Sequence, residues 1–371
     1  MWTIILAVII ILLIAGTAYL VAALGRFGWI RSVSGDSRLK RILISSMITG
    51  AAFAVCYYVF SLINAIFILI YTILFFLIFG FFARIIGFIR KDESGIYWQG
   101  WLALLATFLF FLVGYFQCNN IWQTDYYLET EKNLGELKIA MFADSHLGTT
   151  FDGEGFEKEL KNIEAQHPDI LLICGDFVDD WSCKADLIKA CRAMAGADFK
   201  YGVWIAYGNH DEGFFDSRDF SAGELKQILE ENGIHLLQDE CQLVDDRFYV
   251  AGRRDRGLGG RQNMDQLLEG ADTGKYIIVL DHEPNDYEAE AASDADLVLS
   301  GHTHGGQLIP INITGKLSGV HDRVYGYERR KGTDFIVTSG ISDWALQFKT
   351  GTRSEYVIIN ISQADSVSSP E

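Results

Sequence analysis

The sequence predicts a layered α/β sandwich that follows a region of four membrane-spanning helices. Three observations predict it: uncharged apolar runs fill the first 124 residues, strand-like and helix-like segments alternate in the middle of the chain, and strands cluster toward its end. Alternating strands and helices favour a sheet covered by helices, and the later strands favour a second sheet layer. We therefore expect a four-span region at residues 1–124, a polar linker at 125–136 and an α/β domain at 137–371.

The N-terminal apolar runs are long enough to cross a bilayer, which takes about 20 residues. Residues 1–25 carry no charge, and they lack the basic start of a cleaved signal peptide. Residues 42–83 are also uncharged; as one helix they would be about 63 Å long, so we expect two spans that meet near 61–64. Residues 95–124 form the fourth span, with Trp and Tyr at both ends as is typical of membrane interfaces.

The basic residues of this region predict its orientation. They lie between the first and second spans and between the third and fourth spans: Arg26, Arg31, Arg38, Lys40, Arg41, Arg84, Arg90 and Lys91. Connections rich in Lys and Arg stay in the cytoplasm. Four crossings then place both ends outside, so we expect an integral protein of the cell membrane whose α/β domain is extracytoplasmic.

The charge of the chain is divided unevenly between its two regions. The first 118 residues contain eight basic and three acidic residues, a balance of +5, so the remainder carries −22 of the total of −17. So acidic a domain repels nucleic-acid backbones, and we expect no nucleic-acid partner. The six cysteines show neither C-x-x-C pairs nor zinc-ribbon spacing, so no disulfide framework is predicted.

Five apolar strand-like segments end in residues that commonly bind metals. These ends are Asp144-Ser145-His146, Gly175-Asp176 with Asp179, Gly208-Asn209-His210-Asp211, Asp281-His282 and Gly301-His302-Thr303-His304-Gly305-Gly306. They include five of the eight histidines. In an extended segment residues i and i+2 face the same way, so His302 and His304 can point into one pocket. Open α/β sheets place their sites at such strand ends.

The composition of this set indicates a kind of metal. Carboxylate, amide and imidazole ligands without thiolates suit Mn, Fe, Zn or Co rather than a cysteine-type structural zinc. One carboxylate can also bridge two cations about 3.5–4 Å apart, an arrangement used for phosphoryl transfer.

Five motifs, taken in order over roughly residues 137–361, resemble the motif set of calcineurin-like metallophosphoesterases. They are D-S-H, G-D-F-V-D, G-N-H-D-E, the lone strand-end His282 and G-H-T-H-G-G. The four-span leader is similar to that of membrane-anchored members. The resemblance implies an αββα sandwich. It also implies a phosphoesterase, for example a phosphodiesterase, in which a hydroxide shared by two metal ions attacks phosphorus.

The resemblance also implies a role for each motif residue. Asp144, His146 and His304 would hold one ion, Asn209, His282 and His302 the other, and Asp176 would bridge them. His210 would lie by the phosphate and Asp179 would orient His210. The chain departs from the family where Asp180-Trp181 follow, because a glycine is common two residues on.

Two arginines at the end of a predicted strand, Arg253 and Arg254, followed by Arg256, could grip an anionic group of the substrate. Structural pairing with the acidic surface is the alternative.

We expect a phosphorylated small molecule or lipid as substrate, at a membrane. A pyrophosphatase acting on a lipid-linked or nucleotide-sugar diphosphate is a second enzyme hypothesis, and a sensor that binds a phosphorylated ligand without turnover is a non-enzyme hypothesis. The complete ligand set favours an enzyme.

Overall fold

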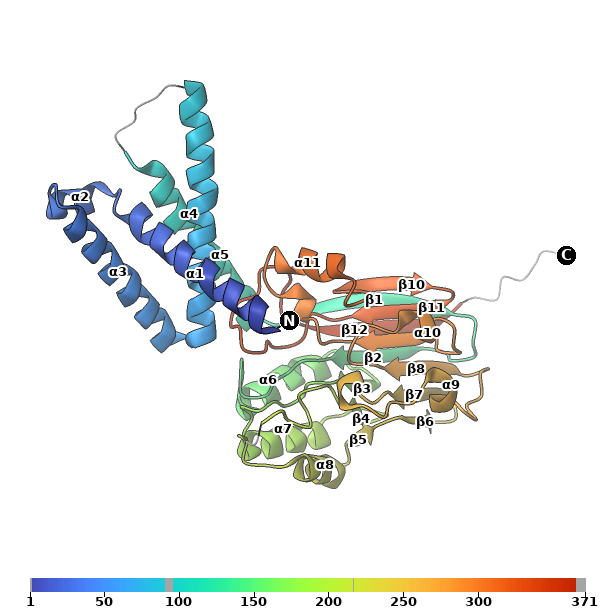
Figure 1. Cartoon of the computed structure of the whole chain (residues 1–371). Coiled ribbons are helices and arrows are strands. Elements are labelled where there is room, and N and C mark those ends of the chain that lie inside the picture. Colours follow the sequence, from blue (N-terminus) through green and yellow to red (C-terminus); the bar gives the residue numbers. More distant parts are fainter. Residues whose placement is uncertain (1, 91–95, 216, 365–371) are drawn as a thin grey trace. The chain divides into compact units, whose positions relative to one another are not determined.

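The computed structural model describes residues 2–90, 96–215 and 217–364. It divides into two compact units (Figure 1). The helical unit comprises Met1–Gly114 with Ala345–Gln347, and the sheet unit comprises Tyr115–Trp344 with Phe348–Glu371.

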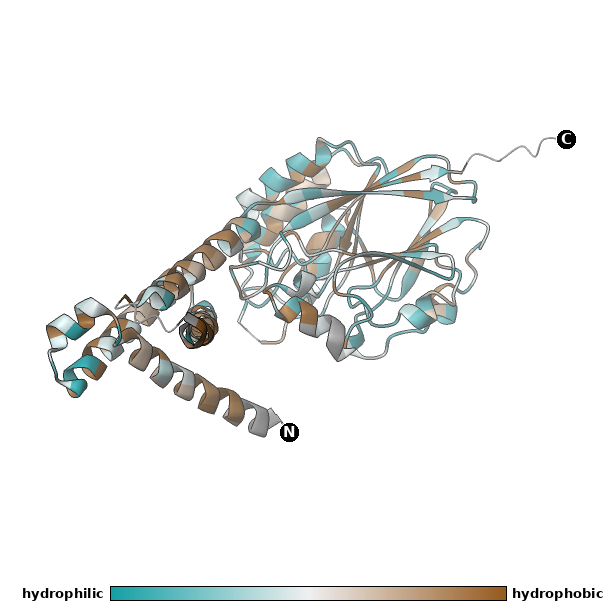
Figure 2. Ribbon diagram, turned by 90° about the horizontal axis from the view of Figure 1, so that it is seen from above, coloured by the Kyte–Doolittle hydropathy of each residue, from teal (hydrophilic) through white to brown (hydrophobic). Residues whose placement is uncertain are grey.

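The helical unit contains four long helices and one short one. They are α1 (Trp2–Leu24), α2 (Gly28–Ser34), α3 (Arg38–Val59), α4 (Leu62–Arg90) and α5 (Trp98–Asn119), the last of which continues into the sheet unit from Tyr115. All but α2 are long and apolar enough to cross a membrane, and they are coloured as hydrophobic over most of their length (Figure 2). The four expected spans correspond to these helices. The third is longer than expected, so that Arg84 lies inside α4 rather than in a connection.

The sheet unit contains two six-stranded sheets, with strand orders β1-β12-β2-β3-β4-β5 and β10-β11-β9-β8-β7-β6. The strands of the first sheet are β1 (Trp122–Thr130), β2 (Leu137–Phe142), β3 (Ile170–Cys174), β4 (Val203–Ala206), β5 (His235–Leu237) and β12 (Glu355–Gln363). Those of the second are β6 (Glu240–Val244), β7 (Phe248–Gly252), β8 (Tyr276–Leu280), β9 (Leu297–Ser300), β10 (Gly326–Arg330) and β11 (Thr333–Val337).

Helices cover the outer faces of both sheets. On the first sheet they are α6 (Gly153–Glu164), α7 (Lys184–Gly196) and α8 (Ala222–Glu231), and on the second α9 (Met264–Leu267) and α10 (Tyr287–Glu290). The unit also contains α11 (Ile311–Ser318) and the short 3₁₀ turns η1 (Arg256–Leu258) and η2 (His304–Gly306). Good caps start two of them: the Asp152 carboxylate accepts from two backbone N–H groups of α6, and Ser221 forms a capping box with Glu224 at α8.

The alternation of side chains along each strand builds the layers. In β2, Ile139 and Met141 pack between the sheets, whereas Ala140 and Phe142 pack under α6 and α7. On the far side, β11 contributes Phe335 to a third cluster with residues of α9 and α10. A strand that is buried on both faces has no polar positions, which explains the continuous apolar runs of the sequence. The order of layers is helix, sheet, sheet, helix, which confirms the predicted αββα sandwich (Figure 1).

The prediction of a polar linker at residues 125–136 is wrong for residues 125–130. Residues Trp122–Thr130 form β1, which pairs in parallel with β12 along its whole length. This strand is at an edge of the sheet, and edge strands carry charged residues that oppose aggregation. Because β1 contains Asp125 and Glu129, its composition resembles that of a polar linker. Only residues 131–136 connect β1 to β2.

Candidate metal centre

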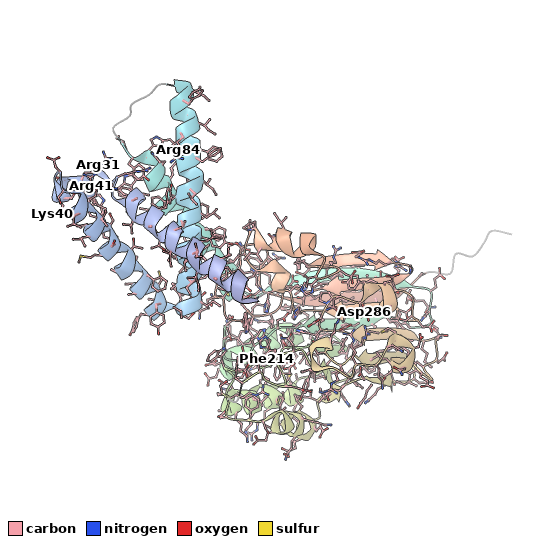
Figure 3. All side chains as sticks on the ribbon, viewed as in Figure 1. Arg31, Lys40, Arg41, Arg84, Phe214 and Asp286 are labelled. Atoms are coloured by element: carbon pink, nitrogen blue, oxygen red, sulfur yellow. The ribbon has the colours of Figure 1, made fainter. Side chains whose placement is uncertain are left out.

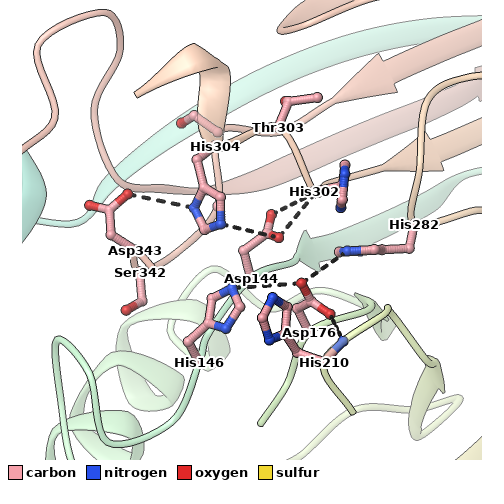
Figure 4. A network of polar contacts seen from close by, with 12 residues as sticks. Asp144, His146, Asp176, His210, His282, His302, Thr303, His304, Ser342 and Asp343 are labelled. Carbon is pink, nitrogen blue, oxygen red and sulfur yellow. Dashed lines mark hydrogen bonds and ion pairs between the residues drawn. The ribbon is translucent and has the colours of Figure 1, made fainter. Parts of the chain in front are cut away.

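The predicted ligands lie at the carboxyl ends of five strands from both sheets (Figure 4). In the first sheet, β2, β3 and β4 are parallel neighbours, and in the second, β8 and β9 are. Their pairing continues beyond the strands: the N–H of Asp144 donates to the carbonyl of Gly175 (3.0 Å), and that of Gly301 to the carbonyl of His282 (3.0 Å). The ends of neighbouring strands are thereby fixed side by side, so the ligand loops converge.

Two groups of side chains could each hold a metal ion. Asp144, His146 and His304 form one group, and Asp176, His282 and His302 form the other. Within each group the ligand atoms lie within 4.8 Å of one another. The side-chain oxygen of Asn209 is 2.9 Å from Nδ1 of His302 and joins the second group. The structure thus brings together all seven predicted ligands.

The carboxylate of Asp176 connects the two groups. Its Oδ2 lies 3.1 Å from Nε2 of His282 and 3.7 Å from Nε2 of His146. Its Oδ1 accepts a hydrogen bond from the backbone N–H of His210 at 2.8 Å. One oxygen of a single carboxylate therefore faces a histidine from each group, as a bridging ligand would.

The backbone at these ligands is constrained. Asp144, Asp176 and His302 adopt φ values of 57°, 52° and 67°, in the left-handed region that is uncommon for residues other than glycine. A Cβ atom at Gly208 would overlap the carboxylate of Asp176, so only glycine lets the loop after β4 approach this closely.

The electrostatics of the site fit a cation. Burial opposes a charge on His282, yet the nearby Asp176 carboxylate raises the pKa of His282 well above its usual value. Burial and the charge of His282 lower the pKa of His302 to about 3, which keeps this ring neutral and able to bind a metal. Nε2 of His146 and Nε2 of His282 are buried, and both face Oδ2 of Asp176. Buried imidazole nitrogens that face a carboxylate are suited to a divalent ion.

The structure corrects the expected role of Asp179. Its Oδ2 lies 3.4 Å from Nδ1 of His146, not beside His210. In the described part of the chain, Nδ1 of His210 has no hydrogen-bond partner. The reason is that the loop after β3 pairs with the loop after β2, for example through the N–H of Leu147 and the carbonyl of Phe177. Asp179 therefore faces His146, and its other oxygen accepts from the N–H of Trp181 at 2.7 Å.

Two buried carboxylates support the site although no role was assigned to either of them from the sequence. Asp343 lies 3.6 Å from Nδ1 of His304 and 3.0 Å from the ammonium of Lys349. Asp211 accepts hydrogen bonds from three backbone N–H groups, those of Asp176, Val178 and Gly208. A signal for Asp343 was present, because the apolar strand β11 is followed by Gly340-Ile341-Ser342-Asp343, the same layout of a strand and a polar end.

The arginines suggested for substrate binding lie in different surroundings. Arg253 is buried, and its guanidinium pairs with Asp281 (2.9 Å), Asp286 (2.8 Å) and Glu290 (3.0 Å). This corresponds to the structural alternative, because three carboxylates already pair with both terminal nitrogens of that guanidinium. Arg254 is partly exposed, and its nearest carboxylate, Glu212, is 3.8 Å away.

Comparisons with known proteins agree with this geometry. Residues 137–306 match the family described as Calcineurin-like phosphoesterase. An uncharacterised metallophosphoesterase of Aquifex aeolicus is 34% identical over 246 residues, which are 64% of this chain and 90% of that protein. One of Campylobacter jejuni is 32% identical over 61% of this chain and 59% of its own length. A transmembrane protein with metallophosphoesterase domain from Danio rerio is 27% identical over 80% of this chain and 72% of its own.

Proposed function

Because this chain belongs to the calcineurin-like metallophosphoesterase family, we propose that it is a membrane-anchored hydrolase of phosphate esters that uses two divalent metal ions. The observation that carries the proposal is the position of Asp176 Oδ2, which faces His282 and His146 from the two ligand groups. When bound, such ions supply Lewis acidity that polarises the phosphate and lowers the pKa of a water nucleophile.

We assign three roles to the residues of the site: metal ligands, carboxylates that orient the ligands, and residues that contact the substrate. Asp144, His146 and His304 would hold one ion, Asn209, His282 and His302 the other, and Asp176 both. Carboxylates beside metal-binding histidines fix the orientation of the ring, and this is the role that we assign to Asp179 at His146 and to Asp343 at His304. Arg254 is the remaining candidate for binding an anionic part of the substrate.

His210 is assigned to the phosphate rather than to a metal. Its ring lies 5.0 Å from that of His146, measured between centroids, and it belongs to neither ligand group. An imidazole in this position can stabilise charge on the phosphate oxygens or protonate the leaving oxygen.

The placement of basic residues supports an extracytoplasmic sheet unit. Arg31, Lys40, Arg41 and Arg84 lie at the same end of the helical unit (Figure 3). By the positive-inside rule this end faces the cytoplasm. Four helices are long and apolar enough to cross a membrane, and after four crossings the chain would continue from α5 on the opposite side.

The test separates metal binding from turnover. In the purified full-length protein loaded with Mn, Asp176→Asn should lose both bound metal and hydrolysis of aryl phosphate esters. His210→Ala should keep its metal and lose about a hundredfold or more in rate. His235→Ala, an exposed histidine of β5 whose ring stacks on Trp204, is the control and should change neither. A wild-type protein that binds Mn and hydrolyses no phosphate ester would contradict the proposal.

A further inference from the structure

Exposed aromatic side chains lie beside His210. The ring of Phe214 is 4.9 Å and that of Trp344 5.6 Å from the imidazole, between centroids. Phe214 is 57% exposed and Trp344 42%, although each contacts a half-buried histidine. Phe215 and Trp181, in the same two loops as Phe214 and Asp179, are 74% and 73% exposed. We call these four residues the aromatic rim.

A buried carboxylate holds part of this rim in place. Asp180 is only 6% exposed, and it accepts hydrogen bonds from the backbone N–H groups of Phe214 (3.0 Å) and Phe215 (2.9 Å). Its own carbonyl accepts from the hydroxyl of Ser217 at 2.8 Å. The loop after β4, which carries Phe214 (Figure 3), is therefore tied to the loop after β3, which carries Asp176 and Asp179. A loop whose backbone is fixed before binding loses little entropy when a ligand covers its aromatic side chains.

The other flank of the site is polar. The ring of His321 lies 5.3 Å from that of His302, whereas Phe214 and Trp344 contact His210. A molecule whose phosphate lies between the two ligand groups would thus meet aromatic rings beside His210 and a polar ring beside His302. The residues after Cys118 carry a net charge of −22, which disfavours polyanions and favours a substrate with few charges beyond its phosphate.

We propose that the aromatic rim binds the apolar part of the substrate, so that the site is selective for phosphate esters that carry a long alkyl, acyl or prenyl chain. This inference rests on the proposed phosphoesterase activity and names its substrate class. Exposed aromatic clusters of this kind usually mark binding surfaces, and contact with an apolar chain removes their surface from water. The same chemistry would serve a lipid within the bilayer or a dissolved amphiphile.

The test uses two pairs of esters that differ only in chain length. Methyl and decyl 4-nitrophenyl phosphate share one leaving group, and methyl and decyl phosphate are the corresponding monoesters. The full-length protein in lipid nanodiscs should show a kcat/KM at least tenfold higher for the decyl ester of whichever pair it hydrolyses, with the ester dissolved below its critical micelle concentration. Tenfold corresponds to about 1.4 kcal/mol, less than the burial of one Phe side chain.

Phe215→Ala and, separately, Phe214→Ala should lower the ratio of decyl to methyl kcat/KM by about fivefold or more. Both keep the backbone N–H groups that Asp180 binds, so the loop is retained. Phe215→Ala complements Phe214→Ala, because the ring of Phe214 contacts the catalytic candidate His210. Tyr127→Ala removes an equally exposed ring of β1, 79% exposed, and should leave the ratio unchanged.

The outcomes separate the two proposals. A wild-type protein that cleaves neither member of either pair refutes the phosphoesterase function. Cleavage of the methyl ester without preference for the decyl ester refutes the role of the rim alone. A loss in the Phe variants that appears only when the decyl ester is embedded in the nanodisc also overturns it, because the rim would then contact the bilayer and not the substrate.

Discussion

The buried ion pair between Lys349 and Asp343 should contribute strongly to the stability of the sheet unit. Both side chains are fully buried, with Nζ 3.0 Å from Oδ1. Lys349 also donates to the carbonyl of Ser339 at 2.7 Å. Asp343 in turn faces Nδ1 of His304 at 3.6 Å. Lys349→Met keeps the length of the side chain and removes its charge, so Asp343 would be left in the interior without this cation.

The magnitude follows from burial. Removing one partner of a buried ion pair costs about 3–5 kcal/mol. In a unit of this size 1 kcal/mol shifts the unfolding midpoint by about 2–4 °C, so Lys349→Met should lower it by about 6–20 °C. Lys189→Met is the matched control, because Lys189 pairs with Glu154 at 2.6 Å on the surface. Solvent weakens such a pair, and the midpoint of this variant should hardly move.

Two measurements on the full-length protein separate the structural and the metal-related roles of the pair. Tryptophan fluorescence during heating gives the midpoint, and metal analysis after dialysis against a weak chelator gives the affinity. Asp343→Asn should bind one of the two ions about 10–100-fold more weakly, because it alters the carboxylate that orients His304. The double variant with Lys349→Met should recover part of the lost stability, since no unpaired charge remains. If Lys349→Met is no less stable than Lys189→Met, the reasoning from burial is refuted, and unchanged metal binding in Asp343→Asn refutes the positioning role.

Two further predictions concern the arrangement of the chain. In intact cells, an added protease should digest the region after Asp125 and spare the connection from Arg26 to Arg41; the reverse pattern on immunoblots against the two ends would invert the proposed orientation. A fragment that begins at Trp122 should fold, bind two metal ions and hydrolyse soluble aryl phosphates, whereas one that begins at Glu131 should aggregate, because it lacks β1 and leaves β12 as an unpaired edge. Equal solubility of the two fragments, or a folded and metal-loaded longer fragment without activity, would contradict this expectation.

Much of the fold could be predicted because the sequence pattern has a direct physical cause. The buried strands of both sheets are continuous apolar runs, as β3 shows with Ile170–Cys174, and the helices over them have one apolar face. The edge strand β1 could not be found in this way. Its alternate residues face solvent, so its composition is that of a connection, and its partner β12 lies at the other end of the chain.

The two candidate ligand groups could be found from the sequence because a metal site restricts the residue type at each position. Asp144, Asp176 and His282 each end an apolar strand, and parallel strands bring such ends to one edge. The supporting carboxylates are harder to find, because their partners are set by tertiary contacts. Asp179 was expected at His210 and lies at His146, since the contact depends on how two loops pair and not on the spacing of the motif. Asp343 is separated from its partner His304 by 39 positions in the sequence.

The charged residues are distributed differently in the two units, which indicates different roles for them. Helices α1 and α5 contain no charged residue, and α3 carries its basic residues only in its first turn. Charged residues within membrane spans usually mark transport or proton pathways, so these helices have the composition of an anchor. The ligand groups all lie in the sheet unit. An anchor raises the effective concentration of a substrate that is held at the same bilayer. That benefit is greatest for an amphiphile, the class of ester that the aromatic rim would bind, and it would be small for a freely diffusing phosphate ester.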